Sequence, residues 1–313
     1  MSQIKINILK QGIISQNVIS CSFFTMKDSY RQFSKYENNL KRFLKQTEQL
    51  PNFEVRIYTD DTGKDFVLNI SQSYSTVSVY HYNCSELREE RGHIGTFGTL
   101  VRFLPMFENL DIVWISDIDI PDSFLNTKLL SLMEKNNCSA FIQTLICYER
   151  KVYGRKYTIT ADRMIFRFKF PKLLLTRFIT KLINDQLKLS IHKLNVANIS
   201  KPESKVPYGI DEVFINSSIY DHMKKQSLKL ICQKDYFMTS GYYKHYANMP
   251  VDKQNILLHY YKTGSSFSKV KEIFKQYVPN LLTDYPCFQE LLDNLSSFKH
   301  DFIKTNIISS SDL

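Results

Sequence analysis

Two aspartates follow a short apolar segment near the middle of the chain. The segment is Asp111–Ile120, Asp-Ile-Val-Trp-Ile-Ser-Asp-Ile-Asp-Ile, and it contains the only tryptophan of the protein. Within it, the β-branched residues of Ile112–Ile115 are typical of a strand buried on both faces. We therefore expect Asp117 and Asp119 just beyond the carboxyl end of that strand. A spacing of two places both side chains on the same side of an extended backbone. Converging carboxylates favour a cation between them, which predicts an Mg²⁺ or Mn²⁺ site; the alternative is a polar turn after a core strand.

A second acidic pair, Asp211 and Glu212, lies at the start of an apolar helical turn within 207–216. Acidic groups placed in this way could act as a general base or stabilise positive charge. A helix N-terminus also favours negative charge. Capping therefore explains the pair as well as catalysis does.

The composition favours a globular protein and disfavours several enzyme classes. The chain has 313 residues, of which 43% are hydrophobic, enough for a sizeable core. No Gly-x-x-x-x-Gly-Lys-Ser/Thr loop occurs, and Gly92, Gly95 and Gly98 do not directly follow a predicted strand. Walker-type ATPases and Rossmann dehydrogenases are therefore disfavoured. The six cysteines are scattered singly, which indicates reduced core residues.

No segment has the pattern of a membrane span or a secretion signal. The sequence has no run of eighteen apolar residues, and its first twenty residues lack the basic-then-apolar order of a signal peptide. We therefore expect a soluble, cytoplasmic protein. The abundance of Asn, Lys and Ile is typical of an AT-rich genome, such as that of a large virus or an intracellular microbe.

The net charge of +10 predicts an anionic partner. Lysine and arginine are concentrated between residues 148 and 181, where Glu149 and Asp162 are the only acidic residues and Tyr148, Tyr153 and Tyr157 are interleaved. This pattern allows a nucleic-acid surface, although a solvated basic face is the more common outcome. Charge does not decide between nucleotides, other phosphates and nucleic acid.

Strand-like and helix-like segments alternate along most of the chain, which predicts an α/β fold with a mostly parallel sheet flanked by helices. Predicted strands cover 17–24, 53–59, 75–82, 112–115, 139–147, 163–168 and 228–232, and predicted helices cover 33–50, 97–104, 125–135 and 171–189. Later helical patterns predict a helical extension over 265–313 after a domain over 1–264, with the final serines frayed.

The order of these parts resembles the nucleotide-sugar-dependent glycosyltransferases of the GT-A fold, in particular the glycogenin-like and lipopolysaccharide-galactosyltransferase-like enzymes. The first predicted strand ends near Thr25 and Asp28-Ser29-Tyr30, which resemble the family's uracil-binding turn with one extra residue. Val101-Arg102-Phe103 before Trp114-Ile115-Ser116-Asp117-Ile118-Asp119 resembles its Arg-Phe helix and Asp-x-Asp strand. Asp211-Glu212 with Asn216 resembles its later acidic motif.

The resemblance implies a role for each of these positions. Thr25, Tyr30, Arg102 and Asp117 would bind the donor; Asp117 and Asp119 would bind the metal, together with His259 or, as the competing candidate, His245. Asp211 and Glu212 would be the catalytic pair, acting either as the base toward an acceptor hydroxyl or as the stabiliser of an oxocarbenium-like state.

The function implied is transfer of a sugar from a UDP-sugar, with Mn²⁺ or Mg²⁺, to a glycan, lipid-linked or protein acceptor. One alternative is a phosphatase of the haloacid-dehalogenase type, which also uses Asp-x-Asp at a strand end, normally after the first strand. The other is a non-catalytic basic nucleic-acid-binding protein; we do not expect nucleic acid to be the partner, because that would leave the strand-end carboxylates unexplained.

Overall fold

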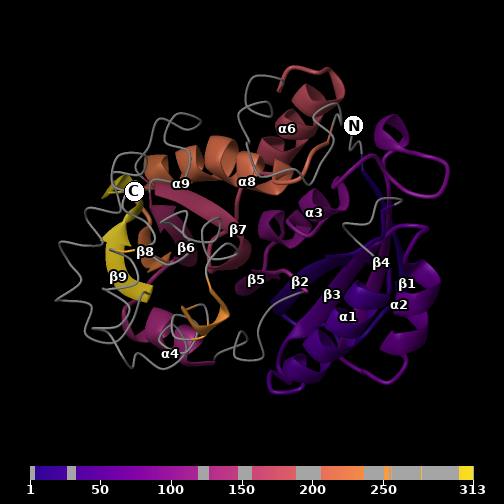
Figure 1. The fold of residues 1–313 in the computed structure, drawn as a ribbon. Coiled ribbons are helices and arrows are strands. Elements are labelled where there is room, and N and C mark those ends of the chain that lie inside the picture. Colours follow the sequence, from indigo (N-terminus) through magenta and orange to yellow (C-terminus); the bar gives the residue numbers. More distant parts are fainter. Residues whose placement is uncertain are drawn as a thin grey trace.

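The protein forms a three-layer α/β structure around one mixed sheet of nine strands in the order β1-β4-β3-β2-β5-β7-β6-β8-β9 (Figure 1). It is known from a computed structural model that describes residues 4–26, 33–118, 127–146, 157–187, 206–235, 250–253, 255, 276 and 303–312. The predicted fold class, a mixed α/β sheet flanked by helices, is confirmed.

The first half of the chain builds the parallel part of the sheet. Its strands β2, β3, β4 and β5 cover Asn17–Phe23, Glu54–Thr59, Val77–Asn83 and Ile112–Ser116. β2 pairs in parallel with β3 on one side and with β5 on the other, and β3 pairs in parallel with β4. β5 is almost entirely buried, as its composition predicts. Because these strands are parallel, their carboxyl ends meet at one edge of the sheet.

The second half of the chain extends the sheet beyond β5 with both orientations. Strands β6, β7, β8 and β9 cover Ala140–Ile146, Tyr157–Phe166, Lys229–Asp235 and Ile303–Ser309. β7 is antiparallel to both β5 and β6, β6 is parallel to β8, and β8 is antiparallel to β9. The antiparallel β7 therefore starts at the edge where β5 ends.

Helices cover both faces of the sheet and form two hydrophobic cores. One core packs α3, α6, α8 and α9 against the sheet, and the other packs α1, α2 and α4 against the opposite face; in Figure 1 α6, α8 and α9 lie along the upper side and α4 along the lower. The helices cover Phe33–Thr47 (α1), Lys64–Ser71 (α2), Gly98–Val101 (α3), Thr127–Lys135 (α4), Leu173–Ile183 (α6), Ile210–Phe214 (α8) and Tyr220–Gln226 (α9). Cys21, Cys84, Cys138 and Cys232 are buried free thiols, as predicted.

Several elements differ from the sequence-based expectation. The edge strand β1, Lys5–Lys10, and helix α2 were not predicted. β1 is mostly exposed and lacks the apolar run of a buried strand. β7 begins at Tyr157, inside the segment expected only to be basic.

The predicted helical extension over 265–313 is corrected at its end. Residues Ile303–Ser309, which include the first of the serines expected to fray, are strand β9 paired with β8. This strand was missed because the pairing that forms it is supplied by a segment about 70 residues earlier in the chain, β8. Residues 277–302, where a helix was predicted, lie outside the described residues.

Candidate active site

The carboxyl ends of β2 and β5 mark the place where the chain order of the strands reverses. From β2 the chain adds β3 and β4 on one side and then β5 on the other. In open α/β sheets, ligands bind outside the carboxyl ends of the strands at such a point. Thr25 follows the end of β2 by two residues and Asp117 directly follows β5. Two of the residues predicted to bind the donor therefore lie at this position.

Arg102, directly after α3, links the elements at this edge of the sheet. Its side chain is buried, with 1% of the residue exposed. Nη1 donates to Asp117 Oδ1, and Nη2 donates to Asp211 Oδ2 at 2.7 Å and to the carbonyl oxygen of Ala161 at 2.7 Å. The hydroxyl of Ser20 in β2 donates to the Arg102 carbonyl oxygen at 2.6 Å. One guanidinium thus joins the end of β5, strand β7 and the first turn of α8.

Arg102 is a buried cation at the end of its helix. Arg102 does not face solvent. The Asp117 and Asp211 carboxylates accept hydrogen bonds from its Nη atoms inside the protein. Burial alone would lower the pKa of Arg102, but the adjacent Asp117 and Asp211 carboxylates raise it. Arg102 therefore stays charged and positions both carboxylates. Its predicted contact with the donor stays a prediction.

Asp162 on β7 is a third carboxylate at this place, which sequence reasoning missed. The backbone N–H of Asp117 donates to the Asp162 carbonyl oxygen at 3.0 Å, so the two residues are neighbours across β5 and β7. Asp162 Oδ1 is buried and has no hydrogen-bond partner among the described residues, and burial raises the pKa of this carboxyl group. The only signal in the sequence was an acidic residue directly before a predicted strand, within a basic segment. We call Arg102, Asp117, Asp162 and Asp211 the Arg102 cluster.

The metal site stays a prediction. Within the described ranges no group of three histidine, cysteine, aspartate or glutamate side chains is placed to hold a metal ion. Of the predicted ligands, Asp117 is described, and its side chain is 28% exposed. Asp119, His245 and His259 lie outside the described residues, as does Tyr30 of the predicted uracil-binding turn.

The acidic pair lies in the first turn of α8, as predicted, after Gly209 in the left-handed conformation with φ 82°. Asp211 is buried, and burial raises the pKa of its carboxyl group against the lowering effect of Arg102. Glu212 is half-buried beside it. Asn216, the last residue of the motif, is not at the site surface: its amide bonds the backbone N–H and C=O of Ile159 at 3.0 and 2.7 Å. It attaches the helix to β7.

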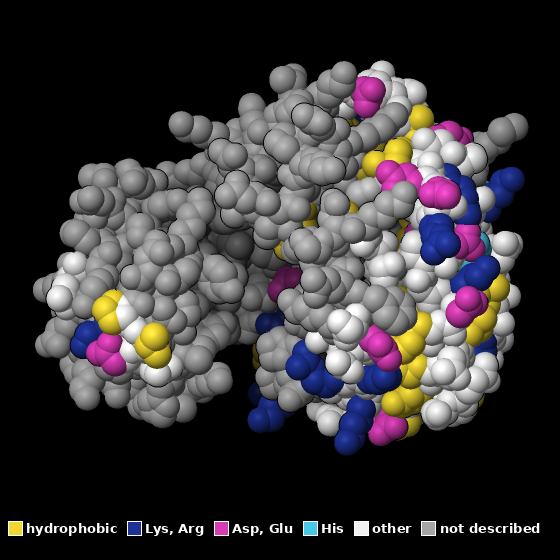
Figure 2. Space-filling view, turned by 45° about the vertical axis from the view of Figure 1, so that its right-hand side comes forward, with side chains coloured by type: hydrophobic (Ala, Val, Ile, Leu, Met, Phe, Trp, Pro, Cys, Tyr) yellow, Lys and Arg dark blue, Asp and Glu magenta, His cyan; other side chains and the backbone are white. Residues whose placement is uncertain are grey.

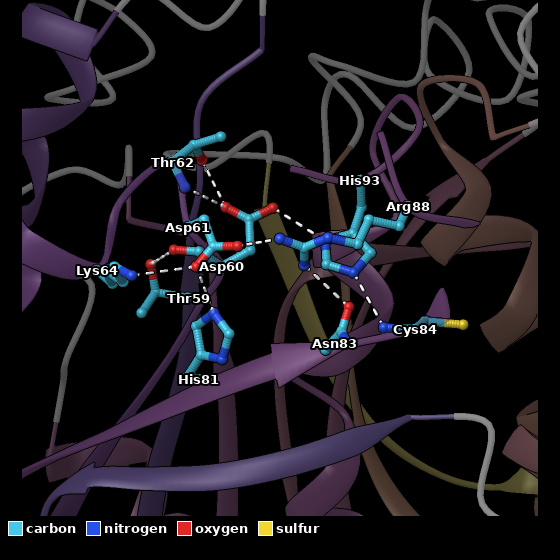
Figure 3. Close-up of polar contacts among 10 residues, drawn as sticks. All are labelled: Thr59, Asp60, Asp61, Thr62, Lys64, His81, Asn83, Cys84, Arg88 and His93. Atoms are coloured by element: carbon cyan, nitrogen blue, oxygen red, sulfur yellow. Dashed lines mark hydrogen bonds and ion pairs between the residues drawn. The ribbon is translucent and has the colours of Figure 1, made fainter. Parts of the chain in front are cut away.

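A second polar cluster, also missed from the sequence, lies at the carboxyl ends of β3 and β4 (Figure 3). Asp60 Oδ1 accepts hydrogen bonds from the backbone N–H and hydroxyl of Thr62, at 3.0 and 2.5 Å, and Asp60 Oδ2 lies 3.1 Å from His93 Nδ1. The backbone N–H of Cys84 donates to His93 Nε2 at 3.0 Å. The N–H of Thr25 donates to the Thr62 hydroxyl at 2.9 Å. We call these five residues the Asp60 network.

Two of the three glycines noted in the sequence allow segments to approach these strand ends closely. A Cβ atom on Gly92 would lie 2.8 Å from Thr62 Cγ2 and 3.1 Å from Asp60 Oδ2. A Cβ atom on Gly98 would lie 2.4 Å from Phe24 Cδ1 and 2.4 Å from the Tyr82 hydroxyl. Their role is close packing over the strand ends, in agreement with the absence of a dinucleotide fingerprint.

The face drawn in Figure 2 is not uniformly basic. On the side drawn in Figure 2, lysine and arginine side chains alternate with aspartate and glutamate. Residues 147–156, where the predicted basic segment begins, lie outside the described residues. Across the described part of the chain, no helix combines the length and apolar character that a membrane span requires.

Comparison with known proteins gives a distant likeness among solved structures and none among sequences. No protein-family model matches the sequence, and no curated protein sequence matches it. Among solved structures, 4-diphosphocytidyl-2C-methyl-D-erythritolsynthase from Anaerococcus prevotii DSM 20548 is similar over 64% of this chain and 85% of its own, with 12% identity and a TM-score of 0.31. A likeness this distant supports no argument about function. Any proposal must therefore be supported by the site geometry.

Proposed function

We propose that this protein is a metal-dependent glycosyltransferase that moves a sugar from a UDP-sugar to an acceptor hydroxyl. The observation that supports the proposal is the Arg102 cluster: one buried guanidinium holds Asp117 and Asp211 together at the reversal point of the strand order. These two residues come from separate parts of the sequence. Both match the motifs on which the resemblance to GT-A glycosyltransferases depends.

A divalent cation beside Asp117 is part of this proposal, and three observations support it. Three carboxyl groups gather around Arg102, Asp117 is partly exposed, and Asp162 has a buried oxygen without a hydrogen-bond partner in the described residues. Asp117 and Asp119 would hold Mn²⁺ or Mg²⁺, with His259 or His245 as a further ligand. When bound, the cation supplies Lewis-acid assistance to the departure of a diphosphate.

The remaining groups have roles in orientation and charge. Thr25 and Tyr30 bind the nucleotide, and Arg102 fixes the positions of Asp117 and Asp211. The acceptor oxygen forms a bond to the anomeric carbon while the bond from that carbon to the diphosphate oxygen breaks, and UDP leaves with the electron pair. Asp211 or Glu212 accepts the acceptor's proton, or it stabilises the positive charge that develops on the sugar while the departing diphosphate oxygen accepts that proton.

Nucleotide binding with and without metal tests the proposal. UDP, GDP and nucleoside monophosphates are each added with and without Mn²⁺, and the melting temperature is measured. We expect UDP with Mn²⁺ to raise it by about 5 °C at roughly a hundred times the Kd. Release of UDP from a panel of UDP-sugars then identifies the donor. Metal-independent, salt-sensitive binding to unrelated DNA or RNA would instead favour a nucleic-acid-binding protein.

Asp119→Ala tests the metal ligand directly. We expect this variant to lose the Mn²⁺-dependent shift and to keep its melting temperature without ligand, because a residue that binds an added ion contributes little to the ligand-free fold. Asp221→Ala is the matched control, since Asp221 is exposed on α9. An unchanged Mn²⁺-dependent shift in Asp119→Ala would remove Asp119 from the metal site.

A further inference from the structure

The Asp60 network joins three strand ends through a continuous set of hydrogen bonds. It runs from the N–H of Thr25, after β2, to Thr62 and Asp60, after β3. It continues through His93 to the N–H of Cys84, after β4. Figure 3 shows the imidazole of His93 between Asp60 and Cys84. The network ends at backbone N–H groups on both sides, so its geometry fixes main-chain positions.

The hydrogen-bond directions in the network follow from its fixed donors. A backbone N–H always donates, so His93 Nε2 accepts from Cys84 and has no proton. The proton of the neutral ring is therefore on Nδ1, which donates to Asp60 Oδ2. Thr62 donates its hydroxyl proton to Asp60 and accepts from Thr25 with the same oxygen. Each group has one arrangement in which every bond is made.

Asp60 and His93 are too buried to contact a ligand themselves. Asp60 is 1% exposed and His93 is 8% exposed. Both Asp60 oxygens are occupied by neutral donors, and its described partners include no lysine or arginine. A buried carboxylate satisfied by directed bonds from neutral groups is costly to bury and restricts geometry strongly. Thr25 is the member that lies at the reversal point of the strand order, where a ligand is expected.

We propose that Asp60, Thr62 and His93 are positioning residues that fix the Thr25 segment in the shape that receives the nucleotide of the donor. This inference rests on the proposed function. Thr62 acts on Thr25 through its hydroxyl oxygen, Asp60 orients that hydroxyl, and His93 orients Asp60 against the β4 end. Gly92 lets the His93 loop approach Asp60 and Thr62 closely enough for these contacts.

Thr62→Val and Thr62→Ser test the proposal as a pair. Valine keeps the shape of the side chain but removes the acceptor for the Thr25 N–H and the donor to Asp60. Serine keeps the hydroxyl. We expect the Kd for UDP with Mn²⁺, measured by calorimetry, to rise about five- to tenfold in Thr62→Val, the equivalent of about one hydrogen bond, and to stay within about twofold of wild type in Thr62→Ser.

Thr47→Val is the matched control for general destabilisation. Thr47 is a buried threonine at the end of α1, and its hydroxyl donates to the Leu44 carbonyl oxygen at 2.7 Å. Thr47→Val removes a buried hydroxyl group, as Thr62→Val does, but at a position outside the Asp60 network. We expect Thr47→Val to lower the melting temperature and leave the Kd for UDP unchanged.

The outcomes separate this inference from the proposed function. If wild-type protein shows no metal-dependent binding of UDP, the proposed function fails. If wild type binds and Thr62→Val binds with the same Kd, or Thr62→Ser weakens binding as much as Thr62→Val, the positioning role is wrong. If Thr62→Val does not fold, His93→Phe replaces it: this change keeps the ring contacts with Tyr82 and Phe97 and removes both nitrogen bonds. An unchanged Kd in His93→Phe would also overturn the inference.

Discussion

The Arg102 cluster and the Asp60 network both place buried carboxylates at the carboxyl ends of the parallel strands, but they satisfy them differently. In the Arg102 cluster, one guanidinium is shared between Asp117 and Asp211, and Asp162 retains an oxygen without a partner in the described residues. In the Asp60 network, neutral donors occupy both oxygens of the carboxylate. The Arg102 cluster has more carboxylate oxygens than described hydrogen-bond donors, which would favour an added cation. In the Asp60 network both oxygens of Asp60 already accept hydrogen bonds, which restricts the geometry of the groups around them. This difference is the reason why we propose chemistry for the first region and positioning for the second.

The largest expected effect comes from removing the shared charge. Arg102→Met leaves the Asp117 and Asp211 carboxylates without their buried partner, and breaking a buried ion pair in this way costs about 3–5 kcal/mol. We therefore expect a lower free energy of unfolding in urea, together with loss of UDP binding.

Arg56→Met is the control for this prediction. Arg56 is also buried, and it bonds Glu54 at 3.1 Å and Glu108 at 2.6 Å, but it is not at the reversal point. It should destabilise the protein and leave the Kd for UDP intact. Equal loss of UDP binding in both variants would show that general destabilisation, and not the position of the charge, explains the result for Arg102.

A smaller effect is expected from crowding the Asp60 network. In Gly92→Ala the new methyl group meets Thr62 Cγ2 at 2.8 Å, and overpacking of this kind costs about 1–3 kcal/mol. The second change, Thr62→Ser, removes Cγ2, the methyl group that the new alanine side chain would contact. The double variant should therefore recover part of the lost free energy of unfolding. If the changes in free energy of unfolding, measured in urea, simply add in the double variant, residues 62 and 92 do not contact each other as described.

The smallest effect concerns Asp61, which is adjacent in sequence to Asp60 and is partly exposed. The hydrogen bond from Arg88, with help from Lys64 and His81, lowers the pKa of Asp61 to about 2. Because the folded-state pKa lies below the ordinary value of 3.8, Asp61 stabilises the fold above about pH 4. That contribution disappears as the pH falls toward about 2.

Asp61→Asn measures this contribution. We expect the variant to be less stable than wild type at neutral pH by about 1 kcal/mol or less, because the side chain is 28% exposed and solvent screens the pairs. The difference should vanish in acid. A difference that stays constant from pH 7 to pH 2 would show that the charge of Asp61 is not its source.

Local sequence patterns determined most of the first half of the fold. The apolar segment that becomes β5, the helical spacing in α1 and the strands β2, β3 and β4 all depend on burial of contiguous or periodic side chains. The same patterns placed Asp117 at a strand end and Asp211 at a helix start. The mostly exposed edge strand β1 and the final strand β9 have no such pattern, since their partners in the sheet define them.

The sequence by itself determined that Asp117 follows a buried strand and that Asp211 lies in the first turn of a helix. Only the tertiary structure decided that Arg102 points inward to join Asp117 and Asp211, that Asp162 lies beside them, and that His93 reaches Asp60. The physical reason is that hydrogen bonds and ion pairs between residues 15 to 109 positions apart depend on how strands and helices stack. A local spacing rule does not extend over that separation.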